Sequence, residues 1–405
     1  MNKKEAGLFN LKIHYIWTFV SSFLLLTPIL GLYYLNYGLE IKDIILVTAF
    51  YNIFIAILEI PTSTLWDTWS RVKVMLLSVI SIGIWILIYF LFPFYEMFFV
   101  AVFFTALWEA LWSWTAHAKL EEDLKAAGKK DDFWKVIWRL IALQRWGALF
   151  APIVIFLLLK FLPPENSYHI LAWLDIILWI FVIYFVSKFR EIETDYKVET
   201  KTIKENLNVQ LNTLKKSFKF VLWTKNLTLL LLLVILWSDA GFLASIFLPI
   251  ITTGWLEDYT SSLFVWIITF FTIFWALSSD KIWKMIWKNR ALILLFSLKG
   301  LVYLWLYFLW WNIIFSTIWI ILVTFLIFAS QPIWNTLLIE CTTSNSIKST
   351  TRSIFFSFIW IYNYLLLLLI SFFEVKIWFV ILWVILLFSG IIIWNMLLFD
   401  KRIKN

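Results

Sequence analysis

The feature of this sequence that most restricts its fold is a series of apolar stretches, each roughly twenty residues long. A stretch of that length can cross the hydrocarbon core of a bilayer as an α-helix. Hydrophobic residues make up 62% of the 405 residues and charged residues only 15%, which excludes a water-soluble globule. The stretches are too long and too continuously apolar for the strands of a membrane β-barrel. The sequence therefore predicts an all-α membrane protein, whose helices satisfy their own backbone hydrogen bonds in lipid.

Charged residues, prolines and asparagines divide the apolar stretches into two groups of six. The first group lies near 13–36, 43–64, 73–92, 94–118, 138–162 and 168–188, and the second near 227–250, 259–279, 291–309, 312–340, 351–373 and 377–399. One polar segment separates the groups, so the halves resemble a duplicated unit. We expect twelve transmembrane helices in two pseudo-symmetric six-helix bundles. Residues 1–189 would form the N-terminal bundle, 190–225 a cytoplasmic linker and 226–405 the C-terminal bundle.

The distribution of cations predicts the orientation of the chain in the membrane. If both termini are cytoplasmic, 29 of the 34 Lys and Arg residues lie in cytoplasmic segments. The positive-inside rule therefore places both termini in the cytoplasm of a multi-pass protein of the cytoplasmic (inner) membrane. The first span would serve as its own targeting signal. The net charge of +8 requires no nucleic acid as partner, because cytoplasmic loops that face anionic lipid account for it.

The linker contains apolar residues at three- and four-residue spacing, interleaved with lysines. The apolar positions are Ile203, Leu207, Leu211, Leu214, Phe218 and Leu222, and the lysines are Lys204, Lys215, Lys216 and Lys219. This pattern predicts an amphipathic helix that lies on the inner leaflet. It would act as a tether between the bundles or as a lipid-sensing element.

Tryptophan is unusually frequent and glycine unusually rare, with 28 Trp residues beside 10 Gly residues. Membrane helices normally use glycine where backbones approach closely. One hypothesis is that the source organism reads UGA as glycine, so that many of these tryptophans stand for glycines. The alternative is a protein that is truly rich in Trp, with indole rings in the interfacial belts. The codons for Trp108, Trp112 and Trp114 would decide between them.

Several classes of site are excluded by residue counts and spacing. A single cysteine, Cys341, permits no internal disulfide and no CxxC motif. The glycines form neither a GxGxxG fingerprint nor a P-loop, so no nucleotide cofactor is expected. No residues with the spacing of metal ligands stand out, and we expect neither a metal nor another cofactor.

The junction of the second and third stretches reads EIPTSTLWDTWSRVK, from Glu59 to Lys73. It resembles the signature loop of the major facilitator superfamily, G-x-x-x-D-x-x-G-R-[KR], which E-I-P-T precedes in a bacterial branch of that superfamily. Asp67 and Arg71 stand at the charged positions of the loop, while Ser63 and Ser70 replace its two glycines. The resemblance implies the fold of that superfamily and a transporter function.

The corresponding place in the second half reads ALSSDKIWKMIWKNR, where Asp280 and Lys284 repeat the charge pattern. Such a loop can act as a conformational gate, since a carboxylate at a helix end can pair with a cation in one conformation and release it in another. We therefore expect a gate made of Glu59, Asp67, Arg71, Asp280 and Lys284. The alternative is that these are ordinary charges that flank membrane helices.

Two further segments extend the resemblance over the whole chain. WEALWSWTAHAKLEEDL, from Trp108, is similar to the pattern G-E-A-x-x-S-G-x-x-E-A-x-x-x-D-x-L of the same branch, with Trp108 and Trp114 at its glycines and His117 at an acidic position. SQPIWNTLLIECTTSNSIKSTTRS, from Ser330, is similar to the stretch before the eleventh helix of the family.

Charges inside the predicted spans are the candidates for solute binding and coupling. A charge at the centre of a membrane helix costs about 2.5–3.5 kcal/mol on insertion scales and needs a partner or water. We expect Glu109, Arg145 and Asp239 to serve transport and coupling. Glu109 and Arg145 would form a pair, because the resemblance places the fourth and fifth helices beside the cavity. Glu109 or Asp239 would carry the proton; the alternative for each is a neutralised structural charge.

These observations predict a secondary transporter that moves a small organic solute by alternating access. Efflux in exchange for protons is the mode that the resemblance favours, with no enzyme activity and a monomeric chain in contact with membrane lipids. Uptake of a nutrient by symport or facilitated diffusion remains an alternative. Two other classes are a transport-inactive scaffold and a membrane enzyme. The enzyme would need a clustered nucleophile, base and acid, which His14, His117 and His169 do not supply.

Overall fold

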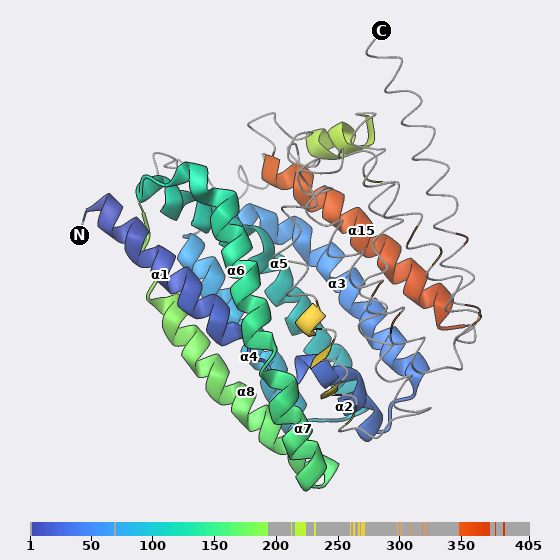
Figure 1. Ribbon diagram of the computed structural model, residues 1–405. Helices are drawn as coiled ribbons and strands as arrows, with labels where there is room; N and C mark the ends of the chain where they lie inside the picture. Colours follow the sequence, from blue (N-terminus) through green and yellow to red (C-terminus); the bar gives the residue numbers. More distant parts are fainter. Residues whose placement is uncertain are drawn as a thin grey trace.

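The computed structural model describes residues 2–68, 70–192, 215–223 and 348–372, together with isolated positions between 212 and 384. In these ranges all regular elements are helices (Figure 1). The longer ones are α1 (Lys3–Ser21), α2 (Leu30–Asn36), α3 (Ile41–Thr68), α4 (Arg71–Leu91), α5 (Tyr95–Ala126), α6 (Phe133–Ala148), α7 (Ala151–Phe161), α8 (Pro164–Ser187) and α15 (Lys348–Ile370).

Five helical segments of the described residues are long and apolar enough to cross a membrane. They are Ile41–Glu59, Arg71–Leu91, Tyr95–Ala126, Lys135–Phe161 and Pro164–Ser187. Each coincides with one of the predicted spans of the first half, and α15 coincides with the predicted span at 351–373. The other predicted spans of the second half lie outside the described residues, as does most of the predicted C-terminal domain. The chain is thus a helical, multi-pass membrane protein.

The first predicted span is interrupted, which the hydropathy pattern did not predict. Residues 13–36 comprise the second part of α1, a break after Ser21, a short 3-10 helix (Thr27–Ile29) and α2. Pro28 lies in the first turn of the 3-10 helix. The first N–H groups of a helix have no acceptor within it, so the N–H that proline lacks costs no helical hydrogen bond. The backbone N–H groups of Leu25 and Leu26 donate to the carboxylate of Asp175 on α8, at 2.7 and 2.9 Å. Asp175 therefore satisfies backbone donors that the break leaves without helical partners.

The fifth predicted span, 138–162, is likewise divided into two helices. α6 ends at Ala148 and α7 begins at Ala151, with Pro152 in the first turn of α7. Proline is tolerated at this position because the first N–H groups of a helix have no intrahelical acceptor. The apolar stretch continues across the joint, which is why the sequence pattern alone showed one span.

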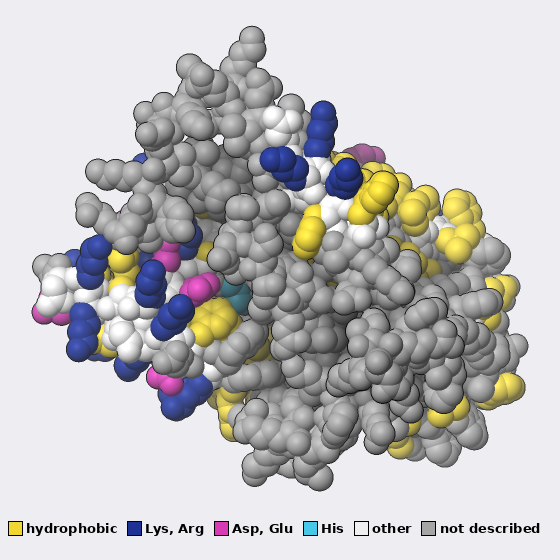
Figure 2. Space-filling model, turned by 90° about the horizontal axis from the view of Figure 1, so that it is seen from above, with side chains coloured by type: hydrophobic (Ala, Val, Ile, Leu, Met, Phe, Trp, Pro, Cys, Tyr) yellow, Lys and Arg dark blue, Asp and Glu magenta, His cyan; other side chains and the backbone are white. Residues whose placement is uncertain are grey.

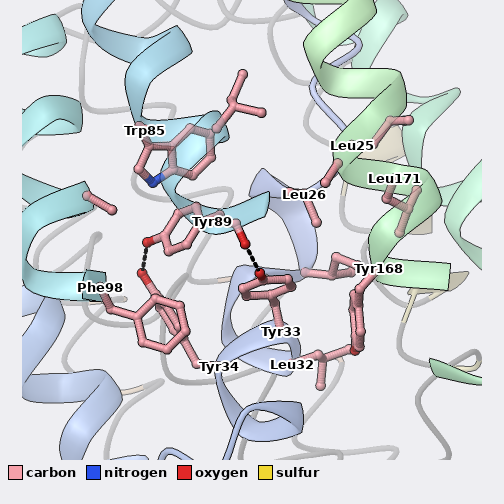
Figure 3. Close-up of a cluster of buried hydrophobic side chains, with 14 of the residues drawn as sticks. Leu25, Leu26, Leu32, Tyr33, Tyr34, Trp85, Tyr89, Phe98, Tyr168 and Leu171 are labelled. Atoms are coloured by element: carbon pink, nitrogen blue, oxygen red, sulfur yellow. Dashed lines mark hydrogen bonds between the residues drawn. The ribbon is translucent and has the colours of Figure 1, made fainter. Parts of the chain in front are cut away.

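A cluster of aromatic side chains holds α2 against α4, α5 and α8 (Figure 3). The Tyr33 hydroxyl donates to the Tyr89 carbonyl at 2.5 Å, and the Tyr34 and Tyr89 hydroxyls share a hydrogen bond. The Tyr168 and Phe98 rings contact the Tyr33 ring edge-on, with centroids 5.4 and 6.2 Å apart. Buried hydroxyl groups need such partners, because an unsatisfied polar group in an apolar interior is costly.

Gly83 on α4 allows α8 to approach closely. A Cβ atom at this position would collide with the indole ring of Trp179. The Nε1–H of Trp179 donates to the Val79 carbonyl at 2.6 Å, so the ring fits into the niche above Gly83. The indole ring of Trp179 thus occupies the space that the absent side chain of Gly83 leaves.

α15 comes from the second half of the chain and packs along α3 of the first half (Figure 1). The Tyr51 and Trp360 rings lie 6.3 Å apart, and the Phe50 and Tyr364 rings 6.5 Å apart. As residue numbers rise along α3 they fall along α15, so the two helices run antiparallel. This pair of helices is a contact between the two predicted bundles.

Part of the predicted linker helix is present as a helical segment at residues 215–223. It lies beside the start of α15, where the Phe218 and Phe358 rings are 5.3 Å apart (Figure 1). Lys215, Lys216 and Lys219 are exposed, and the Lys219 ammonium lies 5.3 Å from the centre of the exposed Trp223 ring. This segment thus exposes cations and apolar side chains together.

Exposed cations gather at one end of the molecule. The start of α1, the connection from α5 to α6 and the 215–223 segment all lie at the upper side of Figure 1. Figure 2 views this end and shows the Lys and Arg side chains over it. Exposed members are Lys3, Lys4, Lys125, Lys129, Lys130, Lys135 and Arg139. We refer to this as the cationic end.

Candidate functional site

Glu109 lies in the middle of α5, at a depth where the helix is otherwise apolar. Its side chain is partly exposed rather than sealed in the helix packing. Within the described part of the chain, no hydrogen bond or ion pair is formed by its carboxylate. A carboxylate at membrane depth needs a proton, a cation or water. With respect to the described residues, the carboxylate of Glu109 is therefore available to bind one of these.

α3 brings a second carboxylate and a phenol toward Glu109. Glu59 on α3 is only 2% exposed, and both Glu59 and Glu109 lie within electrostatic range of the Tyr51 hydroxyl. The Thr62 hydroxyl, one turn beyond Glu59, lies 3.3 Å from the carbonyl of Ala110, the residue next to Glu109. α3 and α5 thus cross closely beside the two carboxylates.

Aromatic side chains from three helices surround this crossing. The Phe54 ring of α3 meets the Phe103 ring of α5 edge-on, with centroids 5.6 Å apart. α15 contributes Trp360, which meets the Tyr51 ring. We define the central site as Tyr51, Glu59, Glu109 and Trp360. It lies where both halves of the chain meet, which is where transporters built from two repeats hold their substrates.

The ion pair that the sequence predicted between Glu109 and Arg145 does not form, although both side chains belong to the described part of the chain. Arg145 lies in the last turn of α6, a helix that packs mainly against α1. The ion pairs among the described side chains join other residues. The pair was expected because the resemblance places the fourth and fifth helices beside the cavity, but that placement does not determine which of their faces meet. Asp239, the third predicted coupling residue, lies outside the described residues.

Several uncharged polar residues also lie within the predicted spans. Asn52 is buried and donates from its side-chain amide to the Thr48 carbonyl of its own helix at 2.7 Å. The Asn52 amide therefore makes this hydrogen bond within α3 and not with a residue of the central site. Asn363 of α15 is also buried, and Gln144 of α6 is exposed. Gln331 and Asn335 lie outside the described residues.

At the cationic end, the predicted gate residue Arg71 pairs with Glu122 of α5, with Nη1 and Oε1 2.7 Å apart. This pair joins the start of α4 to the end of α5 within the first half of the chain. The backbone of Asp67 lies in the last turn of α3, and its side chain lies outside the described atoms. Asp280 and Lys284 also lie outside the described residues, so their role in the gate remains a prediction.

Glu191, which follows α8, binds the N-terminus of α4. Its Oε1 accepts the Val72 backbone N–H at 2.9 Å and a hydrogen bond from the Ser70 hydroxyl. Ser70 is the N-cap of α4 and also accepts from the Lys73 backbone N–H at 3.3 Å. A carboxylate is favourable here because the first N–H groups of a helix are unpaired and its dipole is positive at that end. The segment after α8 is thereby tied to the gate.

A buried polar network lies beside these contacts and centres on Asp123 of α5. Its carboxylate accepts from Lys119 Nζ at 2.5 Å and from Asn10 Nδ2 at 2.7 Å, and contacts His14 Nε2 at 3.0 Å. The Asn10 side chain also bonds the backbone N–H and carbonyl of Arg190, both at 2.9 Å. The network thus connects α1, α5 and the segment after α8. We call Asp123, Lys119, Asn10 and His14 the α1–α5 network.

The sequence analysis missed most of this end of the molecule. Glu122 stands four residues before the end of α5 and was contained in the quoted family pattern, but its pairing with Arg71 was not foreseen. Lys119 and Asp123 have the i, i+4 spacing that favours an ion pair on one helix face. Asn10 and Glu191 carried no sequence signal, because their partners lie more than one hundred residues away.

No family model matches this chain, and no curated protein matches it in sequence. Solved structures do match it over almost its whole length. A nucleoside transporter, NupG, has a TM-score of 0.65 at 13% identity, covering 99% of this chain and 100% of its own. A variant of a peptide transporter, POT, has a TM-score of 0.73 at 13% identity and 99% coverage of both chains.

A D-xylose–proton symporter has a TM-score of 0.68 at 9% identity, covering 96% of this chain and 97% of its own. At such low identity the similarity establishes the fold alone. The chain therefore shares the helical fold of these membrane transporters. Fold alone does not define function, which must be argued from the site.

Proposed function

We propose that this protein is a secondary transporter that moves a small organic solute across the cytoplasmic membrane by alternating access. One observation carries the proposal. Among the described residues the carboxylate of Glu109 has no partner, and it lies near a contact between the two halves of a chain that has a transporter fold. A structural charge would be neutralised by a fixed partner, whereas a transport site needs a group that exchanges partners.

Glu109 is the coupling residue in this proposal, and a proton is the partner that it exchanges. In one conformation the carboxylate binds solute, and in the other it takes up a proton from the opposite side. Asp239 and Arg145 assist Glu109 in this proposal. The direction is efflux, with the cationic end in the cytoplasm as the positive-inside rule requires.

The gate comprises Glu59, Asp67, Arg71, Asp280 and Lys284; of these, Arg71 lies at the cationic end and Glu59 belongs to the central site. The contact of Arg71 with Glu122 supports this part of the proposal, since the pair ties α4 to α5 at the end that must open. A two-state element of this kind biases the equilibrium between inward- and outward-facing states. In this proposal the chain works as a monomer and belongs to the bacterial branch of the superfamily that carries the EIPT motif.

Proteoliposomes that enclose a pH-sensitive dye test this function. A panel of a nucleoside, a dipeptide, a pentose and an organic cation would be added with and without an imposed pH gradient. At least one solute should move protons only when wild-type protein is present. Glu109→Gln should abolish the coupled proton movement, while Glu96→Gln, an exposed carboxylate at the start of the same helix, should not. The absence of any protein-dependent movement across the panel would refute the proposal.

A further inference from the structure

The central site combines two carboxylates with aromatic rings, and this chemistry restricts the charge of a ligand. Glu59 is buried and Glu109 partly exposed beside Tyr51, whose ring meets Trp360 of the other half. A carboxylate such as that of Glu109 in a low-dielectric region repels an anion strongly and attracts a cation. The face of an aromatic ring also attracts cations, with Trp the strongest.

The cations of the described residues do not neutralise Glu109. Arg71 pairs with Glu122 and Lys119 with Asp123, both near the cationic end of α5. Arg145 forms no ion pair with Glu109. Within the described part of the chain, the charge of Glu109 thus has no fixed counter-charge, and a mobile cation can balance it.

The surroundings favour an organic cation over a hydrated metal ion. No group of three or more His, Cys, Asp or Glu side chains that could hold a metal occurs among the described residues. The neighbours of the site are instead aromatic, with Phe54 against Phe103 and Phe50 against Tyr364. A ligand that carries its charge on an apolar body would bury that body against these rings.

From this arrangement we infer that the solute class of this transporter is the organic cations, with Glu109 as the charge partner and Tyr51 and Trp360 as the aromatic wall. The inference rests on the proposed function and adds the ligand's charge and polarity to it. Glu109 would exchange the cation for a proton, so one carboxylate would serve both binding and coupling.

Binding of tetraphenylphosphonium to the purified protein, measured by equilibrium dialysis, tests this inference. Tetraphenylborate is the matched probe, because it has the same shape and the opposite charge. Wild-type protein should bind the cation at least about tenfold more tightly than the anion, and Glu109→Gln should remove most of this preference. Glu96→Gln should bind as the wild type does.

A second pair of variants tests the aromatic wall. Tyr51→Phe keeps the ring and should retain most of the affinity, while Tyr51→Leu should lose severalfold. Size-exclusion profiles that match the wild type would show that each variant is folded. Equal binding of both probes, or a preference for tetraphenylphosphonium that survives Glu109→Gln, would overturn the inference.

The inference and the proposed function fail in different ways. Tetraphenylphosphonium that binds through Glu109 but never crosses the proteoliposome membrane would support the cation site and refute the transporter. Coupled movement of a nucleoside, dipeptide or pentose, without cation binding at Glu109, would support the transporter and refute the cation site.

Discussion

Arg71 Nη1 lies 2.7 Å from Glu122 Oε1, and this ion pair fastens the start of α4 to the last turns of α5. Both side chains are partly exposed, so the pair contributes modestly, about 1 kcal/mol. In a transporter with two states of similar energy, a change of that size shifts the populations by about fivefold. A weak contact at the gate can therefore alter transport without unfolding the protein.

Reversing one charge of this pair should slow transport, and reversing both should restore it. Arg71→Glu or Glu122→Arg alone should lower the initial rate of flux severalfold, because like charges then face each other. The double variant should recover most of the rate. Proteoliposome flux at equal protein content measures this, with melting temperature as the control for folding. Single variants that match the wild type would show that the pair has no part in the gate.

The α1–α5 network should be important for stability. Asp123→Ala leaves the fully buried ammonium of Lys119 without its carboxylate and should destabilise the protein by about 3 kcal/mol or more. Asp132→Ala is the control, because Asp132 is about half exposed and lies 3.9 Å from Lys135. Thermal unfolding in detergent measures both. An Asp123→Leu/Lys119→Met variant should be less destabilised than Asp123→Ala, since it buries no unpaired charge.

Asp175 should stabilise the break between α1 and α2. Its carboxylate accepts two buried backbone N–H groups, and hydrogen bonds to a charged acceptor contribute about 1.5–3 kcal/mol each. Asp175→Ala should therefore lower the melting temperature more than Asp175→Asn, which keeps one acceptor oxygen. Glu165→Gln, an exposed acid of the same helix, should change it little. Equal effects of the two Asp175 variants would mean that these hydrogen bonds do not support the break.

The high number of Trp residues and the low number of Gly residues lead to a prediction about the codons and the mass of the native protein. The Ser78 hydroxyl donates to the Trp108 carbonyl at 3.1 Å, so α4 approaches the α5 backbone at a position where the related pattern has glycine. Trp179, in contrast, fills the niche above Gly83. We expect UGA at codon 108 and UGG at codon 179. Protein isolated from its source should then have an intact mass below 48.4 kDa. A mass of 48.4 kDa would refute the recoding.

Hydropathy located the described membrane helices, because a membrane span must be long and apolar whatever its neighbours are. It did not show the breaks at Ser22–Leu26 or at Pro152, since the flanking residues are equally apolar. The partner of the first break, Asp175, lies about 150 residues away in sequence. Charge counts alone gave Asp175 no structural role.

The candidate site was predictable only in part. Glu109 stood out because a carboxylate in an apolar helix is rare. Its neighbours Tyr51 and Trp360 did not, since aromatic residues occur throughout the chain. The expected pair with Arg145 does not form, because a resemblance that places two helices beside a cavity does not determine which of their side chains meet. The α1–α5 network required knowledge of long-range contacts that no local pattern contains.

Alternating access itself is tested most directly by distances between spin labels in a Cys341→Ser background. Lys42→Cys with Phe372→Cys labels the ends of α3 and α15 opposite the cationic end, and Lys73→Cys with Lys219→Cys labels the cationic end. In membranes at varied pH, with and without tetraphenylphosphonium, we expect each pair to show two distances, with one pair closing as the other opens. A single, unchanging distance at both ends under all of these conditions would contradict the account.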